Sequence, residues 1–260
     1  MKNIMNNFRN YYFDAQSVKI ITLITMFIDH FVSVFSNILP EYIFIIGNVI
    51  GSITFPIMAY FLVMGFYHTK NIRLYFMRLI IFWIISIIPF YLCHDSNVVG
   101  EIFEFTDIFN NIFFTLLVSL LMLKLLSITK NKFLKLIIVI LSSFSTIFSD
   151  WAVIGVILVF VFYELYRKNY KTYIAPIVVI IYIIINSCYD YFFLGFKYID
   201  KYYIVEDVIV CFGFIISMII LKKLNYDSKK PSRFIKWISY IFYPTHLLFL
   251  WALYFWFYNK

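Results

Sequence analysis

Long apolar runs separated by short polar or charged segments dominate the sequence. A helix needs about 20 apolar residues to cross the hydrocarbon core of a bilayer, and most of these runs are long enough to do so. The pattern predicts an all-α bundle of about nine transmembrane helices, with residues 1–260 forming one domain and no separable soluble part. The nine runs lie at roughly 19–39, 42–67, 74–93, 108–128, 133–149, 151–166, 172–194, 203–222 and 235–258.

Three local features refine this pattern. Between the fifth and sixth runs, "IFSDWAVIGV" offers only Asp150 and Trp151 as a boundary, which fits a tight hairpin or a re-entrant pair; we expect a hairpin. The second run contains Gly47 and Gly51, a spacing that more often marks close helix packing than a ligand loop. No small-residue cleavage site follows the first run, which predicts that this run is retained as a signal-anchor helix.

Composition and charge support a membrane protein. Of the 260 residues, 63% are hydrophobic and 14% are charged, and the mean hydropathy is +0.87, far too apolar for an ordinary soluble domain. The 22 Lys and Arg exceed the 14 Asp and Glu, but their positions indicate a lipid bilayer as the partner and not a nucleic acid. With the N-terminus inside, 19 of these 22 cations lie in cytoplasmic segments. The positive-inside rule therefore predicts that the N-terminus is inside and the C-terminus outside.

Two signatures of other protein classes are missing from the sequence. Cys93, Cys188 and Cys211 are scattered without CxxC spacing, so the cysteines indicate neither a zinc site nor a disulfide framework. The sequence also shows no inverted internal repeat of the kind found in many transporters. We therefore expect no bound metal.

The stretch "ITMFIDHFVS" places a carboxylate and an imidazole side by side in the first run. Asp29 follows Lys19 by ten residues, about 15 Å along a helix, which puts it near the middle of a hydrocarbon core about 30 Å thick. Ionisable groups at this depth are functional by default, so we expect His30 to be a general base and Asp29 to fix its tautomer or stabilise its charged form. A buried pair that only orders helix packing is the alternative. The polar positions of this run form one helical stripe: Thr22, Thr25, Asp29, Ser33 and Ser36.

A second histidine lies in the last run, within "WISYIFYPTHLLFLW". Ser239, Tyr243 and His246 share one helical face, and Pro244 interrupts the helix beside them. One interpretation is that His246 joins a proton-handling site. The other is that its ring only hydrogen-bonds a backbone carbonyl freed by the proline.

Counting from the inner cations predicts how the two histidines are placed. His30 follows Lys19 by eleven residues and His246 follows Lys236 by ten, and both helices run outward. We therefore expect the two rings at nearly the same depth, sharing one cavity. The candidate substrate-binding residues are Ser239 and Tyr243 in the inner half of that cavity and Asn111 and Asp150 at its outer mouth.

Six stretches carry a family resemblance when they are taken in order along the chain. They are "VKIITLITMFIDH", "IGSITFPIMAYFLVMGFYHTKN", "RLIIFWIISIIPF", "NNIFFTL", "FSDWAVIGVILVFVFYEL" and "SYIFYPTHLLFLW". Together they resemble the TraX family of bacterial membrane acetyltransferases, whose namesake N-acetylates conjugative pilin. The Asp-His pair, the Phe-Pro, the His-Thr-x-Asn and the Tyr-Pro-x-His are the most telling matches. One departure is Ser52, which stands where the family usually has an arginine.

The resemblance implies acetyl transfer from acetyl-CoA to an acceptor at or across the bacterial inner membrane. The acceptor implied is a pilin-like amino terminus or a cell-surface glycan or other polymer. The stretch "FYHTKNIRLYFMR", at the inner end of the second and third runs, fits this activity because its cations can bind the CoA phosphates. The alternative is that topology alone requires cations there. The candidate cofactor-binding residues are His68, Lys70, Arg73 and Arg78.

Two other classes of function remain open from the sequence. A proton-coupled transporter would also place His and Asp in mid-membrane, and would couple substrate flux to proton flux without CoA. A non-catalytic assembly factor for surface structures would still function without His30.

Overall fold

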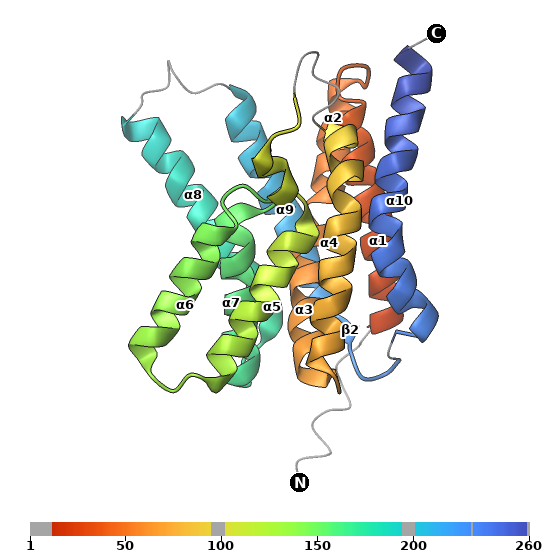
Figure 1. The fold of residues 1–260 in the computed structure, drawn as a ribbon. Coiled ribbons are helices and arrows are strands. Elements are labelled where there is room, and N and C mark those ends of the chain that lie inside the picture. The colour runs from red at the N-terminus through yellow and green to blue at the C-terminus, as the bar shows by residue number, and fades with distance from the viewer. Residues whose placement is uncertain (1–11, 95–101, 194–200, 230, 259–260) are drawn as a thin grey trace.

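The computed structural model describes residues 12–94, 102–193, 201–229 and 231–258, and most of them are helical (Figure 1). Two short strands, β1 (Phe13–Asp14) and β2 (Leu224–Asn225), pair in parallel. They connect the start of helix α1 to the end of helix α9. The predicted all-α fold is otherwise what the structure shows. The helices are α1 (Ala15–Val34), α2 (Glu41–Gly51), α3 (Thr54–His68), α4 (Ile72–His94), η1 (Phe105–Phe109), α5 (Ile112–Ile128), α6 (Lys132–Ser145), α7 (Ala152–Arg167), η2 (Thr172–Ile174), α8 (Pro176–Phe193), α9 (Lys201–Lys222) and α10 (Arg233–Tyr258).

The predicted apolar runs coincide with helices throughout the described parts of the chain. The run at 42–67 is the exception in form, because it contains two helices, α2 and α3. The described residues therefore form a membrane helix bundle, while the crossing of all nine runs and their orientation stay predictions. Within the described residues, five helical segments are long and apolar enough to span a membrane: Ala15–Val34, Glu41–His68, Ile72–His94, Thr172–Tyr189 and Arg233–Phe257.

The close approach of α2 to α1 depends on two glycines. A Cβ atom on Gly47 would overlap the side chain of Val32, and a Cβ on Gly51 would overlap the carboxylate of Asp29. Only glycine lets the two helix backbones come this near. The close packing predicted for Gly47 and Gly51 is thus confirmed, and it seats the end of α2 directly against the intramembrane carboxylate.

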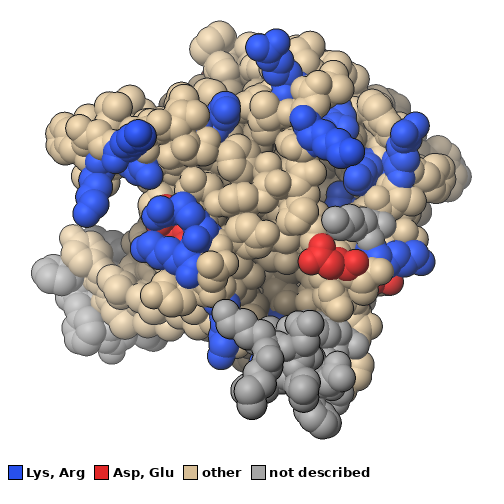
Figure 2. Space-filling model, turned by 90° about the horizontal axis from the view of Figure 1, so that it is seen from below, with Lys and Arg blue, Asp and Glu red and all other residues tan. Residues whose placement is uncertain are grey.

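The two ends of the bundle differ in charge. The described chain begins at the lower end of Figure 1, and α10 finishes at the upper end. Seen from below, Lys and Arg side chains are spread over the molecule whereas Asp and Glu are few (Figure 2). We call this end the basic face; it is formed by the ends of α3, α5, α7 and α9 and the starts of α4, α6 and α10. The charge pattern predicts that this face is cytoplasmic, and we call the other end the opposite face.

The loop between α6 and α7 turns inside the bundle. Helices of 14 and 16 residues are about 21 and 24 Å long, shorter than a hydrocarbon core of about 30 Å. Their connection lies near mid-height in Figure 1. The backbone N–H of Asp150 donates to the Asn110 carbonyl at 2.7 Å, and the Thr115 hydroxyl donates to the Asp150 carbonyl at 2.5 Å. The predicted hairpin therefore carries Asp150 into the interior.

Candidate functional site

Three histidines from three neighbouring helices meet inside the bundle. His30 lies on α1, His94 in the last turn of α4 and His246 on α10, and α10 packs against both α1 and α4. The ring centroid of His30 is 5.0 Å from that of His246 and 5.2 Å from that of His94. His30 is 7% exposed and His246 4%. The structure thus brings together the two histidines that counting placed at one depth, and we call His30, His94 and His246 the histidine cluster.

Hydrogen bonds hold these rings in fixed orientations. The Nδ1 atom of His246 lies 2.7 Å from the Phe242 carbonyl oxygen, and Nδ1 of His94 lies 3.2 Å from the Phe90 carbonyl oxygen. His30 Nδ1 lies 3.2 Å from His94 Nε2. The helix continues through Pro244, and His246 bonds the carbonyl one turn back on its own helix. That contact does not account for the other ring nitrogen, Nε2, which is buried without a partner among the described residues.

The expected contact between Asp29 and His30 is not the one observed. Neighbouring positions on a helix project about 100° apart, so the two side chains leave α1 in different directions. In the described structure the His30 ring is hydrogen-bonded by His94. Asp29 instead lies against Gly51 of α2. Among the described residues no hydrogen bond joins Asp29 to His30, so the role of Asp29 in fixing the His30 tautomer stays a prediction without that contact.

A small polar chamber adjoins His30. This cavity measures about 20 Å³, room for a single water molecule. Asp29, Asp150 and Tyr243 all line it, and the Tyr243 hydroxyl is buried without a hydrogen-bond partner in the described residues. Asp150 was expected at an outer mouth, but the inward turn of the α6–α7 loop places it in the chamber. Trp151, which follows Asp150, has a φ of 65°, a left-handed conformation that is rare for a tryptophan.

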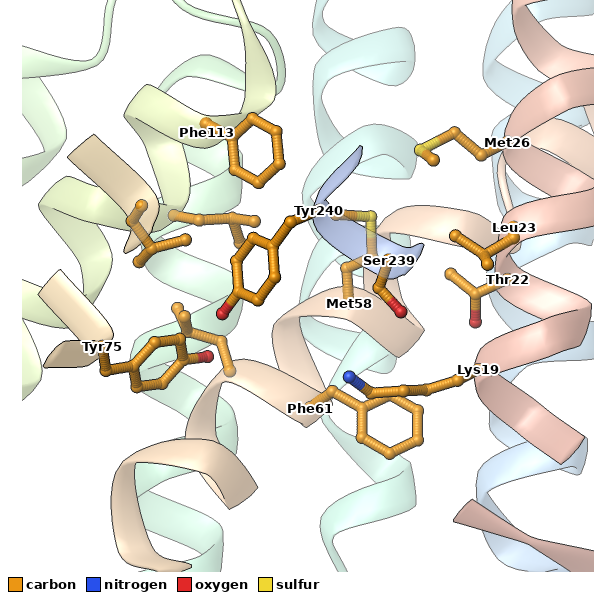
Figure 3. A pocket seen from close by; sticks show the side chains of 13 residues that line it. Lys19, Thr22, Leu23, Met26, Met58, Phe61, Tyr75, Phe113, Ser239 and Tyr240 are labelled. Carbon is orange, nitrogen blue, oxygen red and sulfur yellow. The ribbon is translucent and has the colours of Figure 1, made fainter. Parts of the chain in front are cut away.

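Next to the chamber, toward the basic face, lies an apolar cavity of about 100 Å³. We call this cavity the throat, and Figure 3 shows the side chains that line it. Ser239 and Tyr240 of α10 face Lys19 and Thr22 of α1 across it. The ammonium group of Lys19 lies 5.3 Å from the ring centroid of Phe61. Ser239, predicted to line the inner half of the site, thus lines the throat, and Tyr243, its neighbour one turn along α10, lines the chamber.

A larger cavity of about 390 Å³ opens at the basic face, and we call it the vestibule. Of the predicted phosphate-binding residues, His68, Lys70 and Arg78 line it. Arg73 is exposed and does not line this cavity. Sequence reasoning also missed two cations that do: Lys19 and Lys236, which the topology had used only as markers of the inner side.

Arg78 is the cation most closely fitted to the vestibule. Its guanidinium carbon lies 5.5 Å from the Tyr75 ring centroid and 5.8 Å from that of Tyr240. The Arg78 Nε atom is buried with no hydrogen-bond partner in the described part of the chain. A planar guanidinium held between two rings with a donor left over is suited to bind an oxyanion.

The three cavities adjoin one another. Vestibule and throat share Lys19, Phe61, Tyr75 and Tyr240 in their walls. Throat and chamber share two methionines, Met26 and Met58. The adjoining cavities, bordered by cations at the basic face and by apolar side chains above it, therefore extend to His30.

A fourth cavity approaches the histidine cluster from the opposite face, and we call it the outer cavity. It measures about 190 Å³ and is lined by Ser33, Ser36, Asn37 and His94, among others. Sequence reasoning missed His94 because this residue follows the third apolar run and was grouped with the polar loop. The one available signal was its position four residues after Phe90, on the same helical face, with Pro89 beside it.

Two further sequence positions have structural contacts. Asn111 is fully buried, accepts the backbone N–H of Phe113 at 3.1 Å and donates to the Trp83 carbonyl at 3.2 Å, so it caps α5. Its predicted contact with substrate stays a prediction. Ser52 donates to the Asn48 carbonyl at 2.8 Å and touches α9, where a Cβ atom on Gly213 would overlap it. Helix α9 therefore packs closely against the position where the family usually has an arginine.

Comparison with known proteins identifies the family of this chain. The profile of the family described as "TraX protein" matches residues 14–254, and the chain therefore belongs to the TraX family. One curated relative is the "Probable fimbrial assembly protein FimC, serogroup H1" of Dichelobacter nodosus. It is 26% identical over 249 residues, which cover 93% of this chain and 96% of the relative. No solved structure matches the chain significantly.

Proposed function

We propose that this protein is a multi-pass acetyltransferase of the bacterial cell membrane that acts in the assembly of fimbriae or pili. It takes the acetyl group of acetyl-CoA at the basic face and passes it to an acceptor that arrives from the opposite face. The observation that carries the proposal is the series of cavities from a cationic vestibule, through an apolar throat, to a buried histidine.

The walls of the path match the parts of acetyl-CoA. Its phosphates are polyanionic, and the vestibule offers Lys19, Lys70, Arg78 and Lys236. Its pantetheine arm is narrow and only moderately polar, which suits a throat with apolar walls and a few hydroxyl groups. With the phosphates at the basic face, the arm points the thioester toward the chamber beside His30.

The reaction at this position is a balanced acyl transfer. His30 takes the proton of the acceptor amine or hydroxyl as its nitrogen or oxygen bonds to the thioester carbonyl carbon. The carbon–sulfur bond then breaks, and the proton passes to the sulfur of CoA. His246 contacts the His30 ring, and Asp29 borders the chamber, so both can stabilise charge that develops there.

The acceptor is assigned by analogy with a relative. That relative is called a fimbrial assembly protein, and the family resemblance points to the amino terminus of a pilin-like subunit. A surface glycan is the second acceptor class. Both would reach the site through the outer cavity, on the side away from CoA.

The direct test is turnover by the purified protein in detergent. Release of the free CoA thiol from acetyl-CoA is followed with a pilin-like peptide and with an oligosaccharide as acceptors. We expect acceptor-dependent release in the wild-type protein and a loss of about 10²–10⁴-fold in His30→Gln. Thr245→Val, an exposed position next to the histidine on α10, is the matched control and should keep full activity. Failure of the wild-type protein to bind acetyl-CoA would refute the proposal.

A non-catalytic assembly factor is the second candidate, favoured by the relative's name. The two candidates separate in cells, because a His30→Gln protein would still support fimbrial assembly if no chemistry were involved. Under the acetyltransferase proposal, the same strain should make subunits that lack the acetyl group, which mass spectrometry detects as a missing 42 Da.

A further inference from the structure

The orientation of the His94 ring follows from its contact with its own helix. Its Nδ1 atom lies 3.2 Å from the Phe90 carbonyl oxygen, and its ring stacks on that of Phe90 with centroids 4.2 Å apart and planes 20° from parallel. A carbonyl oxygen can only accept a hydrogen bond. The hydrogen of neutral His94 is therefore on Nδ1, and Nε2 carries the lone pair.

This assignment passes along the next hydrogen bond. His30 Nδ1 lies 3.2 Å from His94 Nε2, and one of the two atoms must donate. Because His94 Nε2 is the acceptor, His30 Nδ1 carries the hydrogen. The lone pair of the His30 ring is then on Nε2.

We propose that His94 is the positioning residue of this site: it holds His30 in the Nδ1–H tautomer and so makes Nε2 the base. The second half of this statement rests on the proposed acetyl transfer, whereas the first half does not. In the Ser-His-Asp triad a carboxylate accepts the Nδ1–H of the catalytic histidine. Here a neutral imidazole on another helix takes that place, and it does so without burying a further charge.

The same hydrogen bond stabilises the charge that forms during transfer. As His30 Nε2 takes the proton of the acceptor, the ring becomes cationic and both its nitrogens donate. The hydrogen bond from His30 Nδ1–H to the lone pair of His94 Nε2 then becomes stronger, because hydrogen bonds from charged donors are stronger than those from neutral donors. When the carbon–sulfur bond breaks, the Nε2 proton goes to the CoA sulfur and His30 is neutral again.

The third member of the cluster offers a matched control. The Nδ1 atom of His246 also faces a carbonyl oxygen, at 2.7 Å from Phe242 O, so its lone pair is on Nε2. Its ring approaches that of His30 at 5.0 Å, yet no hydrogen bond joins the two rings in the described structure. Replacing His246 should therefore leave the His30 tautomer unchanged, whereas replacing His94 should change it.

The chain contains only four histidines, which makes the tautomers directly measurable. Long-range ¹H–¹⁵N correlation on full-length protein labelled with ¹⁵N-histidine, in detergent and without substrate, separates Nδ1–H from Nε2–H rings. We expect His30 as Nδ1–H in the wild-type protein, in His246→Gln and in His94→Gln, whose amide oxygen can replace the Nε2 acceptor. In His94→Leu we expect His30 to lose this preference. An Nε2–H ring for His30 in the wild-type protein would overturn the proposal, even if His94→Leu fails to fold.

Kinetics then test the catalytic half. We expect His94→Leu to lower kcat for acetyl transfer by about 10²–10³-fold with an unchanged KM for acetyl-CoA, and His94→Gln to recover most of that loss. Equal activity of the Leu variant and the wild-type protein would remove His94 from the mechanism. Absence of turnover in the wild-type protein, with the tautomers as expected, would refute the acetyltransferase function but not the assignment of the hydrogen bond.

Discussion

Two arginines that were both predicted to bind phosphate differ in the structure, because only one of them lines the vestibule. Arg78 is half-buried, lies over the rings of Tyr75 and Tyr240, and has an unpartnered Nε. Arg73 lies five residues earlier on the same helix, is exposed and does not line the cavity. If CoA phosphates bind in the vestibule, Arg78→Met should weaken CoA binding and Arg73→Met should not.

The magnitude follows from the hydrogen bonds that the guanidinium can supply. A hydrogen bond to a charged group is worth about 1.5–3 kcal/mol, and 1.4 kcal/mol is a tenfold change in affinity. Loss of Arg78 should therefore raise the Kd for CoA about 10- to 100-fold. Arg78→Lys keeps the charge but not the planar donor group, so its effect should fall between the wild type and Arg78→Met. Arg73→Met should stay within about twofold of the wild type, because exposed charges are strongly screened.

Isothermal titration calorimetry of the purified protein with CoA measures these affinities without any need for turnover. Dephospho-CoA, which lacks one phosphate, should bind the wild-type protein more weakly than CoA does. The maximal rate of acetyl transfer should change little in Arg78→Met, since phosphate contacts are the same in ground and transition states. Equal losses in Arg73→Met and Arg78→Met would show that general surface charge, and not the vestibule, binds the nucleotide.

Three further predictions concern the path and the helices around it. In a background without the native cysteines, Ser239→Cys should react with a small thiol reagent and be protected by CoA. The control Ser228→Cys is exposed at the basic face and should react both with and without CoA. Equal protection of the two cysteines would contradict the placement of CoA in the throat. Gly51→Ala should lower the Tm in detergent by several degrees, because the new Cβ meets the Asp29 carboxylate at an overpacking cost of about 1–3 kcal/mol. In the control Gly65→Ala the new Cβ meets only the end of the Tyr75 side chain, which can move. An equal Tm for the two variants would contradict the close packing of α2 on α1. Asp14→Ala removes the cap of α1 and should lower the Tm at pH 7. The Ser17 backbone N–H holds the pKa of Asp14 below its usual value of 3.8. The stabilisation by the cap is therefore fully present above pH 3.8 and is lost as the pH falls through the folded-state pKa. A Tm difference between Asp14→Ala and the wild-type protein that persists at low pH would contradict a role of the Asp14 carboxylate as the cap.

Depth along a helix was predictable from the sequence, and direction around it was not. His30 and His246 meet because each lies ten or eleven residues from an inner cation, and the rise per residue is constant. Which of two nearby side chains faces a cavity depends on how neighbouring helices pack. That is why Arg78, and not Arg73, lines the vestibule, and why His94 took the contact expected of Asp29.

Loops were the second limit of sequence reasoning. Asp150 was expected at the surface because it lies at the boundary between two apolar runs. The structure folds that boundary inward through hydrogen bonds to Asn110 and Thr115, which are 40 and 35 residues away in sequence. Local composition carries no signal for such contacts. His94 was missed for a related reason, since its helix extends one residue beyond the apolar run that defined it.

The size of the chamber constrains how the proposed chemistry can proceed. At about 20 Å³ it holds one water molecule, whereas a thioester carbonyl and its methyl group need several times that volume. If acetyl-CoA is the donor, its binding must therefore widen the chamber, and the walls differ in how easily they can move. Most are continuous helices, but Gly51 ends α2 at a break in the second run, and Asp150 and Trp151 belong to the inward loop. Trp151 already has a φ of 65°, and strained backbone of this kind is found where surrounding structure holds a conformation for function. The chamber is thus bounded on two sides by segments without a full set of helical hydrogen bonds, and these are the segments that can move without unwinding a helix that carries a histidine.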